Sequence, residues 1–250
     1  MGNSILTVSG LNVRYGHLQA VQDVSFEVKP YEIFGLLGPN GAGKTSTLSA
    51  IEGLLQPQSG QVKIAGYDIW QQPLYAKANM GVQLQHTSFQ PELTVEEIIN
   101  LYAGLYGVDP TLSLEQLGEI PLRKKISELS GGQQQRVSLL ITTIHHPKLV
   151  LLDEPTTGLD PQSRRVLWEK IEAIRERGNG VVLTTHSMEE AEAVCDRLAI
   201  IDHGRILTID TPEGLIEKYR EDPEVIGVSR KGKITLEDVF IALTGRAIRN

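Results

Sequence analysis

A glycine-rich segment, Gly38-Pro39-Asn40-Gly41-Ala42-Gly43-Lys44-Thr45, constrains this chain more than any other part of its sequence. It follows a short apolar run, residues 33–37, and a helical pattern opens at Lys44. This is the phosphate-binding loop pattern, in the position between a strand and a helix that such a loop must occupy. The glycines let backbone N–H groups turn toward phosphates, and the helix N-terminus adds partial positive charge. The segment therefore predicts a nucleotide phosphate site rather than an ordinary glycine-rich turn.

Four short runs of residues are continuously apolar: 33–37, 149–152, 181–184 and 198–201. Such runs are typical of parallel strands that are covered on both faces. Helical spacing separates them, most clearly after the capping pair Asp160-Pro161. In the segment 24–28, by contrast, apolar and polar residues alternate, which predicts a half-buried antiparallel strand. The whole pattern predicts an α/β fold with a parallel sheet.

The strand pattern stops between about residues 87 and 147. There Thr94 and Glu97 form a capping box ahead of a helix with one apolar side, which predicts a helical insert. We also expect shorter helices later in the chain, opened by two further capping pairs, Ser187 with Glu190 and Thr235 with Asp238.

Composition excludes several classes of protein. With 250 residues and 40% hydrophobic content, the chain can bury a substantial core. Its net charge of -7 disfavours a nucleic-acid binder with a broad basic face, so no nucleic-acid partner is expected. The first thirty residues lack a signal-peptide pattern, and no run approaches the roughly 18 apolar residues that span a bilayer. We therefore expect a cytoplasmic chain without a membrane span of its own.

Two carboxylates, Asp153 and Glu154, follow directly on the apolar run 149–152. Parallel sheets bind ligands at the carboxyl ends of their strands, so we expect both side chains near the glycine-rich loop. Asp153 is predicted to bind magnesium together with the Thr45 hydroxyl, and Lys44 to reach the β- and γ-phosphates. Glu154 is predicted to polarise the attacking water as a general base.

The stretch Leu129-Ser130-Gly131-Gly132-Gln133 discriminates best between classes of nucleotide-binding protein. Ser130 and Gln133 form a capping box, so the simplest interpretation is a well-started helix. The pair Gly131-Gly132 needs a further reason, because glycine lowers helix propensity unless the backbone must approach another group closely. A second glycine-bearing helix N-terminus predicts a second anion site.

With these motifs, the chain resembles the ATP-binding subunits of ATP-binding-cassette (ABC) transporters over essentially its full length. The Leu-Ser-Gly-Gly-Gln signature, placed just upstream of Leu151-Leu152-Asp153-Glu154-Pro155, is nearly private to this family. The resemblance implies an α/β fold with a RecA-like P-loop core, an antiparallel β subdomain and a helical subdomain. It also implies an ATPase that uses ATP and Mg2+.

The resemblance gives the expected organisation of the chain. Residues 1–86 and 148–210 are expected to form the ATP-binding core with its β subdomain. Residues 87–147 are expected to form the helical subdomain, and residues 211–250 a short C-terminal extension of the same single ABC ATPase domain.

The resemblance also assigns the signature residues to an interface between subunits. Ser130 and Gly132 are expected to contact the γ-phosphate of ATP held by another subunit, and Gly131 and Gln133 belong to the same signature. A second ABC ATPase subunit, identical or different, is therefore an implied partner. Asp160 corresponds to a loop that crosses this interface, besides its local role as an N-cap.

Three further positions match family motifs. Tyr15 corresponds to the aromatic residue that stacks on adenine, although from sequence alone it is better explained as a buried strand tyrosine. Gln85 resembles the glutamine that contacts magnesium and the attacking water, with neighbouring Gln83 as the alternative assignment. His186 resembles the switch histidine that contacts the γ-phosphate and orients Glu154, whereas by itself it is a polar residue at a strand end.

The chain departs from the family pattern at two positions. Tyr31 stands where the family commonly has glycine, and Ser46, the last residue of the expected nucleotide-binding segment, replaces a common threonine. Neither change is expected to abolish nucleotide binding.

The resemblance implies a separate membrane-spanning permease, with this chain bound at the cytoplasmic face of the membrane. The ending, residues 235–246, is similar to subunits of ABC-2 type export systems, so an exporter is predicted. An importer subunit remains an alternative. So does a soluble ABC-type ATPase that acts on ribosomes or DNA, although such relatives carry two cassettes or long coiled coils.

Overall fold

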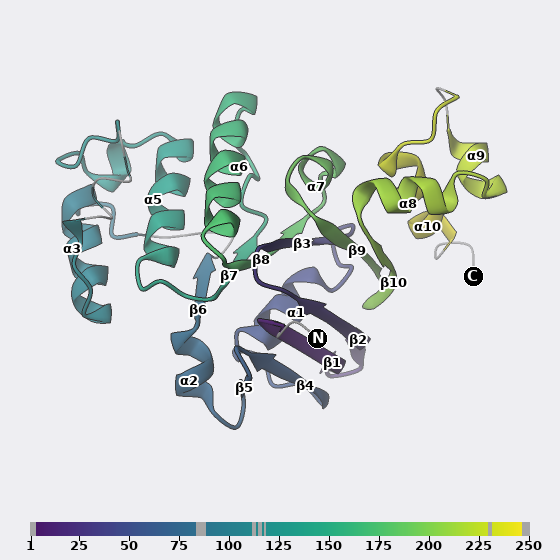
Figure 1. Cartoon of the computed structure of the whole chain (residues 1–250), viewed down its shortest axis with the longest axis horizontal. Helices are drawn as coiled ribbons and strands as arrows, with labels where there is room; N and C mark the ends of the chain where they lie inside the picture. Colours follow the sequence, from purple (N-terminus) through teal and green to yellow (C-terminus); the bar gives the residue numbers. More distant parts are fainter. Residues whose placement is uncertain are drawn as a thin grey trace.

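Strands and helices alternate along the chain and build two sheets, the larger of which is flanked by helices (Figure 1). The computed structural model describes residues 4–83, 89–111, 114, 117, 119–229 and 232–246. The strands are β1 (Leu6–Tyr15), β2 (Leu18–Val28), β3 (Glu32–Leu37), β4 (Ser59–Ile64), β5 (Tyr67–Asp68), β6 (Met80–Gln83), β7 (Leu149–Asp153), β8 (Gly180–Thr185), β9 (Arg197–Asp202) and β10 (Arg205–Asp210). The helices are α1 (Lys44–Ile51), α2 (Pro73–Ala78), α3 (Val95–Tyr106), the 3-10 turn η1 (Ile126–Glu128), α5 (Gly131–Thr143), α6 (Pro161–Glu176), α7 (Met188–Val194), α8 (Pro212–Tyr219), α9 (Pro223–Val228) and α10 (Leu236–Arg246).

The larger sheet has the strand order β10-β9-β3-β8-β7-β6, in which only β10 runs antiparallel to its neighbour. The four predicted apolar runs lie in β3, β7, β8 and β9, and every residue of β3, β7 and β8 is buried. The predicted parallel sheet is therefore confirmed. Because β3, β8 and β7 are adjacent and in register, their carboxyl ends meet at one edge, where Leu37 pairs with Thr185 and Asp153 with Thr184.

The smaller sheet is antiparallel, with the strand order β2-β1-β4-β5. The alternating segment 24–28 lies in β2, as predicted, and its apolar side chains face a core shared with the larger sheet and α1. Phe26 and Phe34 stack across this core with ring centroids 4.9 Å apart. Burial of these faces holds the small sheet against the strand that leads into the glycine-rich loop.

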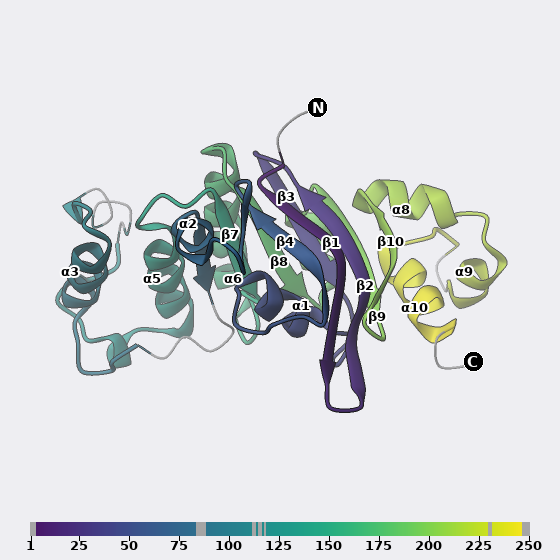
Figure 2. The same ribbon diagram turned by 90° about the horizontal axis from the view of Figure 1, so that it is seen from below.

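Helices α3 and α5 lie at one end of the molecule and α8–α10 at the opposite end (Figure 2). Helix α3 and the middle and C-terminal part of α5 build their own apolar cluster around Ile98, Ile99 and Val137. The capping boxes predicted at Thr94 and Ser130 are both formed. The helical insert is therefore confirmed as a group of helices with its own core.

The C-terminal helices pack against the face of the large sheet that carries α6 and α7, through Leu215, Val225 and Val239 among others. The predicted capping pair opens α10, since the Thr235 hydroxyl accepts from the backbone N–H of Asp238. None of the helices in the described part of the chain is both long and apolar enough to cross a bilayer.

Tyr31, which replaces a common glycine, lies in the turn between β2 and β3 with a backbone φ of 60°. This left-handed conformation favours glycine, because a side chain there crowds the backbone. The tyrosine ring is mostly exposed and packs beside Gly178. The departure from the family pattern is thus tolerated at a local conformational cost.

Candidate active site

The glycine-rich loop wraps the N-terminus of α1 in a conformation that requires its glycines. Gly41 and Gly43 have φ values of 80° and 101°, which side chains rarely permit. A Cβ at Gly43 would also lie 2.5 Å from the carbonyl oxygen of Ala20, so no larger residue fits there. The predicted strand–loop–helix arrangement, with α1 beginning at Lys44, is confirmed.

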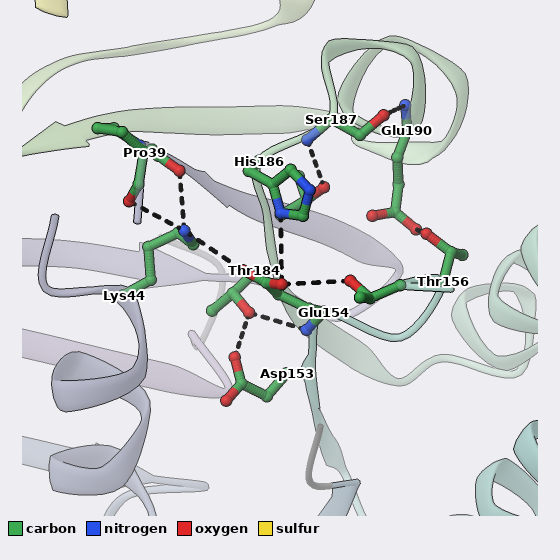
Figure 3. Close-up of polar contacts among 12 residues, drawn as sticks. Pro39, Lys44, Asp153, Glu154, Thr156, Thr184, His186, Ser187 and Glu190 are labelled. Atoms are coloured by element: carbon green, nitrogen blue, oxygen red, sulfur yellow. Dashed lines mark hydrogen bonds and ion pairs between the residues drawn. The ribbon is translucent and has the colours of Figure 1, made fainter. Parts of the chain in front are cut away.

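Lys44 is almost fully buried inside this loop, with only 5% of its side chain exposed. Its Nζ donates to the carbonyl oxygens of Gly38 and Pro39, at 2.8 and 3.2 Å, and lies 3.4 Å from Glu154 Oε1 (Figure 3). The loop therefore holds a lysine charge beside a carboxylate at the carboxyl edge of the sheet.

Asp153 ends β7 and is held from two sides. The Thr184 hydroxyl of neighbouring β8 donates to Asp153 Oδ1 in a short hydrogen bond, and Thr45 Oγ1 lies 3.4 Å from Asp153 Oδ2. One carboxylate oxygen is thus fixed by the sheet, while the other faces the first turn of α1. The structure brings the predicted pair Thr45 and Asp153 together, and it adds Thr184.

Glu154 has a left-handed backbone, with a φ of 46°, and its N–H donates to Thr184 Oγ1 at 3.0 Å. Its Oε2 lies 3.3 Å from His186 Nδ1 and accepts from the Thr157 hydroxyl at 3.2 Å (Figure 3). Burial raises the pKa of this carboxyl, but the Lys44 charge, His186 and Thr157 outweigh it, so the net pKa lies below the usual value. Glu154 is therefore a carboxylate at neutral pH.

A cavity of about 680 Å³ opens over these groups. The size lies within the range of small-molecule sites. Tyr15, at the end of β1 and about half exposed, lies on its wall together with Leu18 and Gln19. The other lining residues come from the glycine-rich loop, from the strand ends and from the β9–β10 turn: Ala20, Asn40, Gly41, Ala42, Gly43, Lys44, Thr45, Ser46, Glu154, Thr157, His186, His203 and Gly204.

The β9–β10 turn, His203-Gly204, is a part of this wall that the sequence did not predict. The Gly204 N–H donates to Ala42 O at 2.9 Å, and the Gly204 carbonyl accepts from the Gln22 N–H at 2.7 Å. The turn is thereby fixed to both the glycine-rich loop and β2. A hint was present in the sequence, because a glycine between two apolar segments favours a tight hairpin turn.

The signature residues 130–133 do not line this cavity. Ser130 caps α5, and its hydroxyl accepts from the Gln133 N–H at 3.3 Å. A Cβ at Gly132 would lie 2.6 Å from Ser163 Oγ, whereas a Cβ at Gly131 would meet nothing closer than 3.9 Å. Close packing within the chain therefore explains why residue Gly132 has no side chain. No contact within the chain explains the same feature at Gly131.

Asp160 caps α6 beside the signature. Its Oδ1 accepts from the N–H groups of Gln162 and Ser163, and its Oδ2 accepts from Ser163 Oγ at 2.6 Å. Because Ser163 also packs on Gly132, the structure brings Asp160 and the signature to one surface, away from the glycine-rich loop of the same chain.

Comparison with known proteins identifies the chain. The sequence profile of a family described as "ABC transporter" matches residues 21–157, over half of the chain. The chain belongs to the ABC transporter family. A second profile, described as "AAA domain, putative AbiEii toxin, Type IV TA system", matches the shorter range 125–192, which holds the signature and the β7 carboxylates.

Relatives of this ABC ATPase extend the similarity to nearly the whole chain. The "Nod factor export ATP-binding protein I" of Burkholderia thailandensis is 34% identical, covering 95% of this chain and 96% of that protein. The proteins of the same name from Paraburkholderia xenovorans and Rhizobium etli are 40% and 33% identical, covering 93% and 95% of this chain and 79% and 92% of theirs.

Solved structures agree with the fold. A "Structure of ATP binding subunit of ABC transporter" is 28% identical with a TM-score of 0.82, covering 96% of this chain and 100% of that one. An ATP-binding cassette of an ABC transporter in its ADP conformation has a TM-score of 0.77 at 24% identity, covering 90% of this chain and 98% of that one. The predicted fold class, a P-loop core with an antiparallel β subdomain and a helical subdomain, is confirmed, and so are ATP binding and ATPase activity as properties of the family.

The glutamine predicted to sense magnesium cannot be placed, because Gln85 lies outside the described residues. Its alternative, Gln83, is described: it is buried at the end of β6, and its Nε2 donates to Gln135 Oε1 of α5. Gln83 therefore links the large sheet of the ABC ATPase to its helical part.

Proposed function

We propose that Lys44, Asp153, Glu154 and His186 form the hydrolytic centre of this ABC ATPase, within an ATP-binding core made of residues 1–86 and 148–210. The observation that carries the proposal is the meeting of the lysine, the left-handed glutamate and the histidine at one cavity. Lys44 binds phosphates, Glu154 accepts the proton of the attacking water, and His186 orients Glu154. Tyr15, which lines the same cavity, is proposed to stack on adenine.

The oxygen atoms of Asp153 and Thr45 are suitable ligands for magnesium. A hydroxyl and a carboxylate oxygen are hard ligands, which suit Mg2+ and leave room for phosphate oxygens and water. In the described part of the chain, no group of three or more His, Cys, Asp or Glu side chains could hold a metal ion by itself. We therefore propose that Thr45 and Asp153, with Gln85, hold Mg2+ only together with the nucleotide; when bound, it would neutralise phosphate charge.

We further propose that two such subunits close on two ATP molecules. The signature residues 130–133 begin α5 of the proposed helical subdomain, residues 87–147, and lie outside the cavity of their own chain. Gly131 has open space around it, which supports close approach of a ligand from outside the chain. In this arrangement Ser130 and Gly132 serve the ATP of the partner subunit, and Asp160 lies at the interface.

Export is the direction of transport that we propose. The support is the similarity, over nearly the full length, to proteins named Nod factor export ATP-binding protein I. Closure of the two ATPase subunits would then act on a separate membrane-spanning permease, with this chain at the cytoplasmic face of the membrane. The similarity covers 95% of this chain and therefore includes most of the proposed C-terminal extension, residues 211–250.

Mixing two inactive variants tests the two-subunit site. Lys44→Ala removes the phosphate-binding lysine, and Ser130→Asp keeps an N-cap for α5 but places a carboxylate where the partner's γ-phosphate would lie. Each variant alone should have little ATPase activity. A mixed dimer contains one intact site, so an equimolar mixture should recover roughly a quarter of the wild-type rate.

The matched control mixes Lys44→Ala with the double variant that carries both changes. No intact site can form there, so the mixture should stay inactive. If the first mixture also stays inactive, Ser130 serves the nucleotide of its own chain and the two-subunit arrangement is wrong.

A further inference from the structure

Glu190 is a buried carboxylate outside the ATP cavity, with only 1% of its surface exposed. The sequence predicts a capping box with Ser187, but only half of it forms. Ser187 Oγ accepts from the Glu190 N–H at 3.3 Å, whereas the Glu190 carboxylate turns inward. There its Oε1 accepts from Thr156 Oγ1 at 2.8 Å (Figure 3) and from Trp168 Nε1 at 3.1 Å.

These partners place Glu190 beside both members of the Glu154–His186 pair. Thr156 follows Glu154 by two residues, and Glu190 itself follows His186 by four. Burial raises the pKa of the Glu190 carboxyl, and the nearby Thr185 hydroxyl, directly before His186, partly opposes this. The same hydroxyl accepts from the Ser187 N–H at 2.9 Å. One carboxylate thus connects the chain after β7, the end of β8 and helix α6.

The backbone at Glu154 needs such support. A glutamate with a φ of 46° is in a strained conformation that persists only where its surroundings hold it. On its N-terminal side the Glu154 N–H is fixed by Thr184. On its C-terminal side the bond from Thr156 to Glu190 holds the chain in place.

We propose that Glu190 is a positioning residue for ATP hydrolysis, which fixes the Glu154–His186 geometry through Thr156 and Thr185. The proposal rests on the proposed role of Glu154 as the base. Moving a carboxylate out of water costs free energy, which hydrogen bonds such as those from Thr156 and Trp168 must offset. A carboxylate at this buried position therefore indicates a positional demand at the site. Because neither Glu190 nor Thr156 lines the cavity, the effect should fall on kcat and leave KM for ATP nearly unchanged.

Four variants of the full chain separate positioning from simple stability. Glu190→Ala and Thr156→Val each remove the bond on the Glu154 side, and a displaced base should lower kcat by about tenfold or more. Glu190→Gln keeps a carbonyl acceptor for Thr156 and Trp168. Its kcat should stay within about threefold of wild type. Trp168→Phe removes only the bond from α6, so it should lower the melting temperature with little change in kcat.

Steady-state ATPase kinetics and thermal unfolding are measured for each variant, with Glu154→Gln as a reference. Support requires that Glu190→Ala and Thr156→Val lose kcat, that Glu190→Gln recovers it, and that combining Glu190→Ala with Thr156→Val adds no further loss. Wild-type kcat in Glu190→Ala, or a loss that only follows the melting temperature as in Trp168→Phe, overturns the proposal. If Glu154→Gln itself retains full turnover, the role of Glu154 fails instead, so the two failures are distinguishable.

Discussion

Glycines lie at the N-termini of two helices, α1 and α5, and the surroundings of these two N-termini differ sharply. Helix α1 opens after Gly43 inside a cavity, with the buried Lys44 and Glu154 next to it. Helix α5 opens at Gly131 outside that cavity, capped by the side chain of Ser130. In the proposed mechanism, the first N-terminus supplies most of one phosphate site, whereas the second supplies only part of a site that a partner subunit completes. Similar local sequences therefore acquire different functions from what tertiary structure places around them.

The glycines themselves show the same difference. The Ala20 carbonyl leaves no room for a side chain at Gly43, and Ser163 leaves none at Gly132. Both glycines therefore serve packing within the chain. Gly131 meets no neighbour closer than 3.9 Å. Its lack of a side chain is useful only if something outside the chain approaches it.

The largest expected effect comes from Glu154→Gln, which tests whether the α1 site performs the chemistry. Removing a general base typically lowers the rate by about 10²–10⁴-fold, and we expect kcat to fall in that range. Binding of ATP should remain, since Lys44 and the loop are unchanged. Steady-state hydrolysis and equilibrium ATP binding measure the two effects separately. A variant with normal turnover would contradict the assignment of the base.

Alanine at the two signature glycines tests whether the α5 terminus faces a partner. Gly131→Ala should leave the melting temperature unchanged but lower the ATPase rate by about tenfold, because a methyl group would obstruct a close phosphate contact. Gly132→Ala should in addition destabilise the fold by about 1 kcal/mol, since Ser163 must shift. Thermal unfolding and ATPase assays check both. Equal loss of stability in the two variants would mean that Gly131, too, is a packing residue.

Glu52 lies at the C-terminal end of α1, away from the N-terminus that carries Lys44, and it tests how a buried carboxyl there affects stability. Burial and the Asp153 charge raise the pKa of its carboxyl to about 7, against the opposing effect of Lys77. A folded-state pKa above the unfolded one means that stability falls as pH rises from about 4.5 to about 7. Glu52→Gln removes this cost, so it should stabilise the protein by about 1 kcal/mol at pH 8 and hardly at pH 5. Denaturant unfolding at the two pH values checks this, and a gain independent of pH would contradict it.

The smallest effect is expected from Tyr31→Gly, remote from both helix N-termini. Relief of the left-handed tyrosine should stabilise the fold by about 0.5 kcal/mol, the gain being limited by the entropy of glycine and the lost contact with Gly178. The ATPase rate should not change. The variant is thus a control in which stability and activity separate, and a changed rate would show that the turn is coupled to the site.

Much of the fold could be predicted from local patterns. Apolar runs become β3, β7, β8 and β9 because strands covered on both faces have no polar side to show. Capping boxes at Thr94 and Ser130 form as predicted because both partners lie within one helical turn. At Ser187 the same pattern is misleading, since Glu190 finds buried donors from Thr156 and Trp168 and leaves the cap.

Some residues of the candidate site could likewise be predicted from local sequence patterns, and others could not. The glycine-rich loop, Asp153 and Glu154 are contiguous motifs, so the sequence predicts them. Thr184 is hidden in an apolar run, and its contact with Asp153 depends on the register between β7 and β8. The His203-Gly204 turn follows β9, which pairs with β3 beside the loop although the two strands are far apart in the sequence. Such contacts join residues that no local pattern relates.

One carbonyl links distant parts of this chain. Side chains at both Gly43 and Gly204 would meet the Ala20 oxygen, at 2.5 and 2.6 Å. Changes at the phosphate loop and at the β9–β10 hairpin are therefore mutually restricted, because any shift of β2 that admits a side chain at one glycine also moves the contact at the other. For protein engineering, this hairpin is a poor place for a label or an insertion, although it looks like an ordinary surface turn.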